Sequence, residues 1–302
     1  MSQPAIKIGT RNSKLALYQA NLVAKKLNEA NIQSQIIEIT SLGDENLTQP
    51  IYKLGTSGVF TKAIDTALLN HKVDIAVHSL KDVPTDLPHK IINLAILERS
   101  HALDVIKLNN SLDHNQKQTI ATGSIRRKAQ WLAKYPNHEV VPLRGNVNTR
   151  LKKLTDNQWT GAIFAKAGLD RLDLLGDNYQ NLDWMIPAPA QGAIVVASLA
   201  ENPINSTVRQ ILNHVPTETT TTVEREFMNA VEAGCSFPLG AIAEIKGEIV
   251  SLHAVVHASN GSEKAEMTSE CHISKIKEFG KQCGIDFAAK HQDFINKIKS
   301  SI

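Results

Sequence analysis

The sequence predicts an α/β protein with two doubly wound lobes and a smaller α+β domain in its C-terminal part. Short apolar strands alternate with helical periodicity from residue 6 onward, which is typical of a largely parallel sheet covered by helices. The same alternation begins again near residue 118, and after Pro216 it gives way to antiparallel strands. A chain of 302 residues also exceeds what one small core usually holds.

The first lobe is predicted from its alternating patterns. Strands are expected at residues 6–8, 34–40 and 73–77, which are short and apolar or alternate in polarity. The polar stretch 41–58 contains three glycines and no periodicity, so we expect a mobile loop there. Two helical stripes lie between the strands: Ala16, Ala20, Val23 and Leu27, then Phe60, Ile64, Ala67 and Leu68.

The second lobe repeats this order. Ser124 is a good N-cap for a helix that runs to Ala133 and ends before Pro136. A strand at residues 193–199 is expected to return to the first lobe, so that two chain crossings form a hinge. The other elements expected here are strands at 118–121, 140–143 and 161–165 and a helix at 146–154.

The remaining residues predict a third domain. Val223, Phe227, Ala230 and Val231 mark a helix, and residues 241–270 indicate antiparallel strands with turns at Lys246-Gly247 and Asn260-Gly261. Helical periodicity then continues from residue 276 to residue 298. The predicted domains are therefore 1–98 with 190–214, 99–189, and 215–302.

Composition narrows the functional class. A net charge of +3 is too small for a dedicated nucleic-acid-binding protein, and the longest apolar run, 193–200, is too short to span a bilayer. Three cysteines without a C-x-x-C pair argue against a disulfide scaffold and a thiolate zinc site, and no metal is expected. Residues 1–14 show no apolar leader pattern, so we expect a cytoplasmic protein.

Arginine recurs where predicted strands lead into helices. Free backbone N–H groups and the positive end of the helix favour anions at such junctions, and arginine adds a bidentate partner for carboxylate or phosphate. A single arginine there is usually a solvated helix start, but recurrence at three junctions favours an anion-binding cleft. This pattern does not distinguish carboxylate from phosphate. The junctions carry Arg11 with Ser13, Arg126 with Arg127, and Arg144 with Arg150.

Two further residues are candidates for chemistry. Asp82 follows the strand 73–77, where a fixed carboxylate can stabilise a developing cation or orient an N–H donor. The alternative is an Asx-turn that leads into Pro84. Cys235 follows Gly234 in a predicted loop, either as a small filler residue or as a nucleophile or attachment point. Cys271 and Cys283 fall on strand and helix patterns and are expected in the core.

These segments together resemble the hydroxymethylbilane synthase family, also called porphobilinogen deaminases. The motif His-Ser-Leu-Lys-Asp-Val-Pro at 78–84 and the motif Leu-Arg-Gly-Asn at 143–146 are highly specific in combination. The matching segments run in family order along nearly the whole chain: 9–13 with Leu15, Ala16 and Gln19, then 74–84, 123–127, 143–150, 188–192 and 234–235.

The resemblance implies type II periplasmic-binding-protein-like lobes and the head-to-tail condensation of four porphobilinogen molecules, with loss of ammonia at each step. It implies a dipyrromethane cofactor held by a thioether to Cys235, and an essential role for Asp82 in stabilising the cationic azafulvene. Further cofactor-binding positions match Lys81, Asp82, Thr122, Ser124, Arg126 and Arg127. Substrate-binding positions match Arg11, Ser13, Gln19, Lys53, Phe60, Arg144, Arg150, Arg171 and Gln191. A monomer is expected.

The chain departs from the family pattern at Leu42, Ser57 and Gly123, where basic residues or a serine are common. The loop 41–58 is therefore less basic than usual, and Lys53, Phe60 and Lys62 are expected to share its work. Two other functions compete with the synthase. A non-catalytic two-lobed binding protein would explain the arginines but leaves Asp82 and Cys235 unused. An RNA-binding protein would use Arg126-Arg127 and Lys152-Lys153, but few aromatic residues are present for base stacking.

Overall fold

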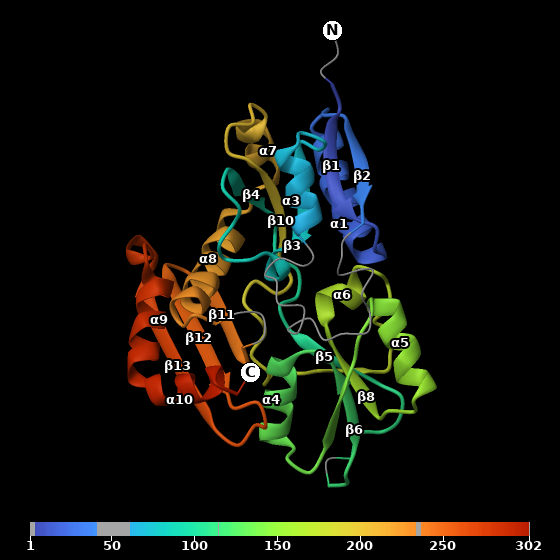
Figure 1. Cartoon of the computed structure of the whole chain (residues 1–302), viewed down its shortest axis with the longest axis vertical. Coiled ribbons are helices and arrows are strands. Elements are labelled where there is room, and N and C mark those ends of the chain that lie inside the picture. The colour runs from blue at the N-terminus through green and yellow to red at the C-terminus, as the bar shows by residue number, and fades with distance from the viewer. Residues whose placement is uncertain (1–3, 41–60, 114, 234–236, 302) are drawn as a thin grey trace. The chain divides into compact units, whose positions relative to one another are not determined.

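The computed structural model describes residues 4–40, 61–113, 115–233 and 237–301 (Figure 1). The chain divides into two compact units. Unit 1 comprises residues 1–100 and 192–218, and unit 2 comprises residues 101–191 and 219–302. The chain therefore enters unit 2, returns to unit 1 and enters unit 2 again.

Unit 1 is built on a five-stranded sheet of order β2-β1-β3-β10-β4. β10, the fourth strand in this order, is buried along its whole length, as expected for a strand covered on both faces. β1 pairs in parallel with β2 and β3, whereas β10 is antiparallel to both β3 and β4. The strands are β1 (Ile6–Arg11), β2 (Ser34–Ile39), β3 (Ile75–Ser79), β4 (Ile91–Ile96) and β10 (Ile194–Leu199).

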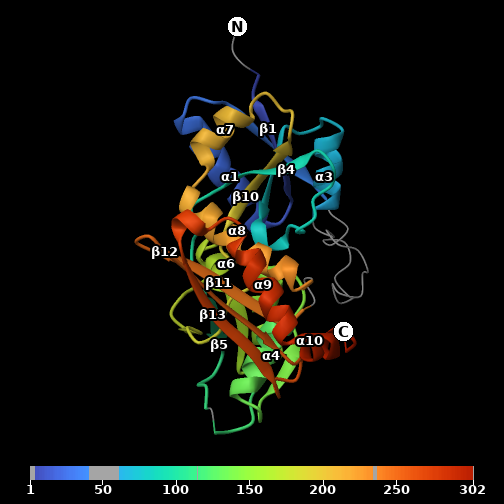
Figure 2. The ribbon, with the colours of Figure 1, turned by 90° about the vertical axis from the view of Figure 1, so that its left-hand side faces the viewer.

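Helices cover both faces of this sheet (Figure 2). α1 (Lys14–Glu29) and α7 (Asn205–Leu212) pack on one face, where Val23 and Leu27 join Ile8 and Ile75 in one core. α3 (Lys62–Leu69) packs on the other face through Ile64 and Leu68. Each fully buried aliphatic side chain contributes about 1.5 to 3 kcal/mol to folding. Unit 1 is therefore a doubly wound lobe.

Unit 2 begins with a second lobe, whose sheet has the order β7-β6-β8-β5-β9. β6 is parallel to β7 and β8, and β5 is antiparallel to β8 and β9. Trp131, on the helix α4 (Ile125–Lys134), is fully buried against this sheet, together with Ile120 and Ile163. The strands are β5 (Asp104–Leu108), β6 (Thr119–Thr122), β7 (Glu139–Pro142), β8 (Gly161–Ala165) and β9 (Tyr179–Asn181). The helices are α4 (Ile125–Lys134), α5 (Val147–Asp156) and α6 (Lys166–Asp170).

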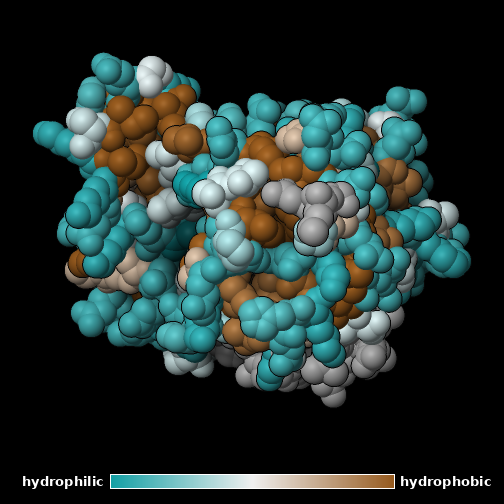
Figure 3. All heavy atoms as spheres, turned by 90° about the horizontal axis from the view of Figure 1, so that it is seen from above, coloured by the Kyte–Doolittle hydropathy of each residue, from teal (hydrophilic) through white to brown (hydrophobic). Residues whose placement is uncertain are grey.

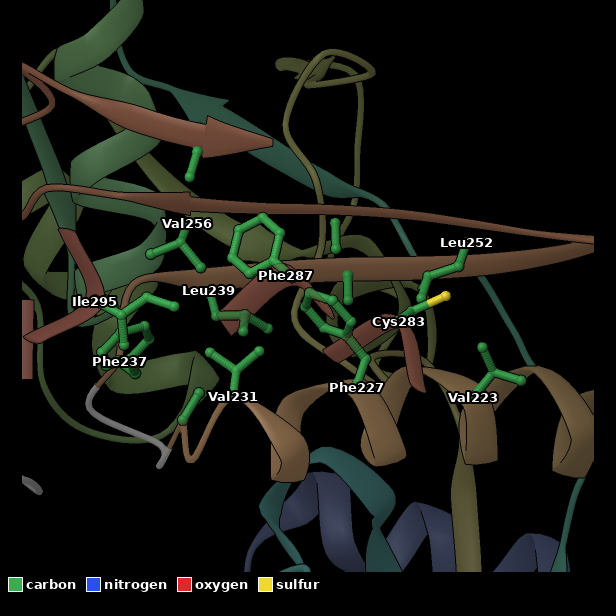
Figure 4. Packing of buried hydrophobic residues seen from close by; sticks show 14 of the residues in the cluster. Val223, Phe227, Val231, Phe237, Leu239, Leu252, Val256, Cys283, Phe287 and Ile295 are labelled. Atoms are coloured by element: carbon green, nitrogen blue, oxygen red, sulfur yellow. The ribbon is translucent and has the colours of Figure 1, made fainter. Parts of the chain in front are cut away.

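The C-terminal part of unit 2 has its own sheet and core. An antiparallel sheet of order β11-β12-β13 packs against helices, and Figure 4 shows Phe227 and Phe287 lying between them. The two rings pack edge to face, with their centroids 5.4 Å apart. Gly247 and Gly261 take positive φ angles of 60° and 78° at the two hairpin turns. The elements are α8 (Val215–Ala230), whose first four residues belong to unit 1, β11 (Leu239–Lys246), β12 (Ile249–His257), β13 (Lys264–His272), α9 (Phe279–Lys290) and α10 (Gln292–Lys299).

The predicted fold class, two doubly wound lobes with an α+β C-terminal part, is confirmed. The helix capped by Ser124, the return of residues 194–199 to unit 1 and both hairpin turns are also confirmed. The division into three domains and the hinge stay predictions. The sequence patterns missed β4, β5, β9, α6 and α7.

The surface agrees with the mixed composition. Hydrophilic side chains predominate on the face in Figure 3, with smaller hydrophobic areas between them. No helix in the described ranges is long and apolar enough to cross a membrane.

Candidate active site

Three polar side chains cap the helices that begin at the predicted anion-binding junctions. Ser13 Oγ accepts a hydrogen bond from Ala16 N at the start of α1, at 3.4 Å. Ser124 Oγ does the same for Arg127 N in α4, at 3.4 Å, and Asn146 Oδ1 accepts from Thr149 N in α5, at 3.0 Å. Each cap fixes where a helix starts and leaves the neighbouring N–H groups available at its positive end.

In unit 1 the end of β3 carries the acidic candidate. Lys81 and Asp82 lie in a 3-10 turn, η2 (Leu80–Asp82), that directly follows β3. Leu80 is fully buried, and its N–H donates to Ala193 O on the segment that leads into β10, at 3.0 Å. Pro84 cannot continue a helical turn, so the turn stays short. Asp82 is exposed on this anchored turn, and Lys81 is half-buried.

The neighbouring α1 is tied to the same strand end. Gln19 is buried and donates from Nε2 to Ser79 Oγ at 2.8 Å. Arg11 ends β1 and is close enough to His78 to act on it electrostatically. Burial, followed by the positive charge of Arg11, lowers the pKa of His78 to about 4, so this histidine is neutral at pH 7. Sequence reasoning gave His78 no role of its own.

In unit 2 the two arginines of α4 converge on one carboxylate that sequence reasoning missed. Asp104, the first residue of β5, is fully buried. Arg126 Nη1 lies 2.7 Å from its Oδ2, and Arg127 Nη2 lies 2.8 Å from its Oδ1. Burial alone would raise the pKa of Asp104, but the two guanidinium charges, with hydrogen bonds from Arg126 and Gln191, hold it well below its usual range.

Gln191 completes this cluster. Its Nε2 donates to Asp104 Oδ1 at 2.9 Å and to Ala102 O at 2.7 Å. Its Oε1 accepts from Arg127 Nη2 at 3.4 Å. Two buried guanidinium groups thus share one buried carboxylate, which leaves an excess positive charge in these four side chains.

The same cluster retains capacity for a ligand. Arg126 is 4% exposed, and its Nε is buried without a hydrogen-bond partner among the described residues. A buried donor without an acceptor is costly, so an orphaned guanidinium N–H beside excess positive charge fits a carboxylate from a bound molecule. Dipyrromethane bears carboxylates, and the residues present fit such a group.

The other candidates of unit 2 lie at the starts of its helices. Thr122 is buried at the end of β6, and its Oγ1 accepts from Ser124 N at 3.2 Å. Arg150 Nε donates to Gly145 O at 2.7 Å, which draws this side chain back over the turn before α5. Arg144 is half-buried; burial lowers its pKa, and its Nε has no hydrogen-bond partner among the described residues. Arg171 is half-buried at the C-terminal end of α6.

Gly123 shows why one departure from the family pattern fits this chain. A Cβ atom added there would lie 2.4 Å from Leu143 O, so a serine would require the backbone to shift.

Some predicted residues cannot be located in this way. Cys235, Lys53, Phe60 and the loop 41–58 lie outside the described residues. Within unit 1 the structure brings Arg11 near His78, and Gln19 against the end of β3. Within unit 2 it groups Arg126, Arg127 and Gln191 around Asp104.

Comparisons with known proteins agree on one family. A model of the dipyromethane cofactor binding domain of porphobilinogen deaminase matches residues 6–205, and a model of that enzyme's C-terminal domain matches residues 219–290. A probable porphobilinogen deaminase from Methanocaldococcus jannaschii is 40% identical, over 93% of this chain and 98% of the relative. A porphobilinogen deaminase from Campylobacter hominis is 34% identical, over 94% of this chain and 95% of the relative.

A solved structure is more distantly similar. The second substrate binding domain of a putative amino acid ABC transporter from Streptococcus pneumoniae gives a TM-score of 0.45 at 9% identity, over 68% of this chain and 91% of that one. The family models and the curated relatives span most of the chain at substantial identity. The chain therefore belongs to the porphobilinogen deaminase family.

Proposed function

We propose that this chain condenses four porphobilinogen molecules head-to-tail into the linear tetrapyrrole hydroxymethylbilane and releases ammonia at each addition. The reaction is primed by a covalently bound dipyrromethane. The match of the cofactor-binding domain to residues 6–205 carries this proposal. The exposed carboxylate of Asp82 and the buried arginine pair of unit 2 support it, because the reaction needs one fixed negative charge and several carboxylate-binding groups.

Asp82 is assigned the catalytic role. Loss of ammonia from the substrate leaves positive charge on the pyrrole ring, and a fixed carboxylate stabilises that charge and accepts a hydrogen bond from the ring N–H. The anchored turn after β3 suits this role, because Leu80 fixes the backbone while the carboxylate of Asp82 remains exposed. His78 lies in the same segment but stays neutral at pH 7, so it adds no competing positive charge.

The arginines are assigned to the acetate and propionate groups. Each porphobilinogen carries two carboxylates, so the growing chain gains negative charge at every step. Arg126 and Arg127, with Thr122 and Ser124 beside them, would hold the cofactor's carboxylates; Arg126 Nε is the group with open capacity. When bound, the dipyrromethane supplies the nucleophilic pyrrole carbon to which the first substrate unit is joined. Lys81 is assigned to cofactor binding, and substrate binding is assigned to Arg11, Ser13, Gln19, Lys53, Phe60, Arg144, Arg150, Arg171 and Gln191.

Cys235 is assigned as the thioether attachment point. A tethered primer keeps each intermediate from diffusing away between additions, and this favours a covalent link over simple binding. We further propose that the chain acts as a monomer in the cytoplasm, with three domains and a hinge between the two lobes.

Intact mass tests the proposed function directly. Wild-type protein purified from cells should carry the extra mass of two linked pyrrole units and should release ammonia from porphobilinogen. Cys235→Ser should lack both, whereas the matched variant Cys283→Ser, which changes a buried cysteine of the C-terminal core, should keep the added mass. Reversible binding of porphobilinogen without ammonia release would instead favour a non-catalytic binding protein.

A further inference from the structure

Glu224 is a fully buried carboxylate to which the proposed mechanism gives no role. It lies on α8, and its oxygens accept backbone hydrogen bonds from two separate segments of unit 2. Oε2 accepts from Ala190 N at 2.6 Å, and Oε1 accepts from Ala243 N on β11 at 2.9 Å. One side chain therefore joins α8, β11 and the segment 186–191.

Ala190, which donates to Glu224, has a strained backbone conformation. Ala190 has a φ angle of 60°, a left-handed conformation that is unfavourable for a residue with a Cβ atom. Such a conformation persists only where the surroundings impose it, and the short charge-assisted bond to Glu224 does so. The next residue is Gln191, whose side chain reaches Asp104 and Arg127. The backbone conformation of Ala190 therefore fixes the position from which the side chain of Gln191 extends.

The other end of this segment is held against α4. Ile186 N donates to Gln130 Oε1 at 2.8 Å, and Ile186 O accepts from Gln130 Nε2 at 2.9 Å. Arg126 Nη1 also donates to Ile186 O, at 2.8 Å. On the opposite side, Ala241 N of β11 donates to Pro187 O at 2.9 Å. The segment 186–191 is thus fixed between the C-terminal sheet and the helix that carries the arginine pair.

We propose that Glu224 is a positioning residue that aligns the arginine pair of α4 with α8, the helix that leads in sequence to Cys235. Glu224 holds the backbone of Ala190, and Ala190 positions Gln191. Gln191 contacts Asp104, the carboxylate that pairs with Arg126 and Arg127. This inference rests on the proposed function, in which the cofactor is tethered at Cys235 and its carboxylates bind at the arginines. The proposed anion site lies on α4, and Glu224 connects α8 to α4 through the segment 186–191.

Glu224→Gln is the sharpest probe of this connection. A glutamine has the same shape, but its amide has one acceptor oxygen, so its NH2 group would face one of the two backbone N–H donors. Glu226→Gln is the matched control on the same helix. Glu226 also accepts backbone hydrogen bonds, but from residues 280 and 281 at the start of α9.

The experiment measures kcat and KM for porphobilinogen per molecule of holoenzyme, with the loaded fraction counted by intact mass. For Glu224→Gln we expect kcat per loaded molecule to fall about tenfold or more, because small misplacements of binding groups are costly, while KM changes less than about threefold. Glu226→Gln should have the wild-type kcat and KM per loaded molecule. A purely structural role for Glu224 would reduce the folded or loaded fraction and leave kcat per loaded molecule unchanged, and that result would overturn the proposal.

Ala190→Gly supplies a rescue. Glycine adopts a φ angle of 60° without strain, so the double variant Glu224→Gln/Ala190→Gly should recover part of the lost kcat. If Glu224→Gln does not fold alone, the double variant is compared with Ala190→Gly, and equal kcat per loaded molecule would count against the positioning role. Wild-type protein without dipyrromethane or ammonia release would contradict the proposed function instead, so the two failures are distinguishable.

Discussion

Both units begin a helix with a capping serine beside arginine, but they use the arginine in opposite ways. In unit 1 Ser13 caps α1, and the charged candidates Arg11, Lys81 and Asp82 are half-buried or exposed. In unit 2 Ser124 caps α4, and Arg126 and Arg127 are buried on Asp104. The same local motif therefore carries a half-buried arginine in unit 1 and builds a buried cationic cluster in unit 2.

The comparison separates two tasks. A group that meets changing charge on the substrate must be reachable, and Asp82 on its exposed turn is reachable. A group that holds constant negative charge benefits from being fixed and desolvated, and the arginines around Asp104 are both. The predictions below test this division, from the largest expected effect to the smallest.

Asp104→Asn should strongly destabilise unit 2. Removing the carboxylate leaves two buried guanidinium groups without their shared counter-charge, which typically costs about 3 to 5 kcal/mol. Urea unfolding measures the loss, with Asp86→Asn, an exposed aspartate, as the control. A loss below about 1 kcal/mol would mean that the cluster is not electrostatically essential.

Asp82→Ala should separate activity from stability. In the proposed role, Asp82 stabilises charge on the reacting ring, so its removal should lower turnover at least about 100-fold, equivalent to about 2.7 kcal/mol. The exposed position predicts a change in unfolding free energy within about 0.5 kcal/mol. Ammonia release and urea unfolding measure the two effects, and turnover near that of the wild type would remove Asp82 from the mechanism.

His78 should make the stability of unit 1 depend on pH. Its pKa is about 4 in the folded protein and 6.5 in its ordinary state, so between these values the unfolded chain binds a proton that the folded chain does not. Unfolding free energy should therefore fall as the pH drops from 6.5 toward 4, by up to about 3 kcal/mol. His78→Phe should reduce this fall in unfolding free energy. The lowered pKa of Asp104 changes the unfolding free energy only below its ordinary pKa of 3.8, outside this pH range.

Thermal unfolding followed at several pH values between 7 and 4 checks this expectation. His257 in unit 2 provides the comparison, since burial, followed by the charge of Lys264, also lowers its pKa to about 4. An unchanged pH profile in His78→Phe would show that His78 is not buried in its neutral form.

The caps should give the smallest effects. Ser13→Ala and Ser124→Ala each remove the side-chain acceptor of a helix N-terminus, which typically costs about 1 kcal/mol. Chemical denaturation measures both, and equal losses would confirm that the two junctions are locally equivalent. A loss of cofactor retention in Ser124→Ala but not in Ser13→Ala would sharpen the distinction between the units.

Local signals in the sequence were sufficient to predict much of the fold. Ser124, the apolar stripe of α1 and the glycines at the hairpin turns act within a few residues, so their effect is visible in a single stretch of chain. The missed strand β5 begins with a charged residue, Asp104, and this breaks the apolar pattern expected of a buried strand. The missed strand β4 pairs with β10, which comes from a distant part of the chain.

The candidate site was predictable in its residue types but not in its internal pairing. The arginines of α4 were found from their position at a strand–helix junction, yet their burial depends on Asp104 and Gln191, which are far away in sequence. Glu224 was missed for the same reason, since its partners Ala190 and Ala243 are brought to it only by the tertiary fold. Its spacing of three residues from Phe227 and seven from Val231 places it beside the predicted apolar stripe, but this spacing does not identify its partners.

The position of β10 also constrains synthesis on the ribosome. Among the described strands β4 pairs only with β10, and β10 is translated after all of residues 101–191, so during that interval β4 and one edge of β3 lack this partner strand. The corresponding strand of the other sheet, β5, is translated before the strands β8 and β9 that flank it. We therefore expect the lobe of unit 2 to close while unit 1 still exposes open strand edges, which are prone to wrong pairing between chains. Nascent chains stalled just before residue 194 should be the most prone to aggregate or to bind chaperones.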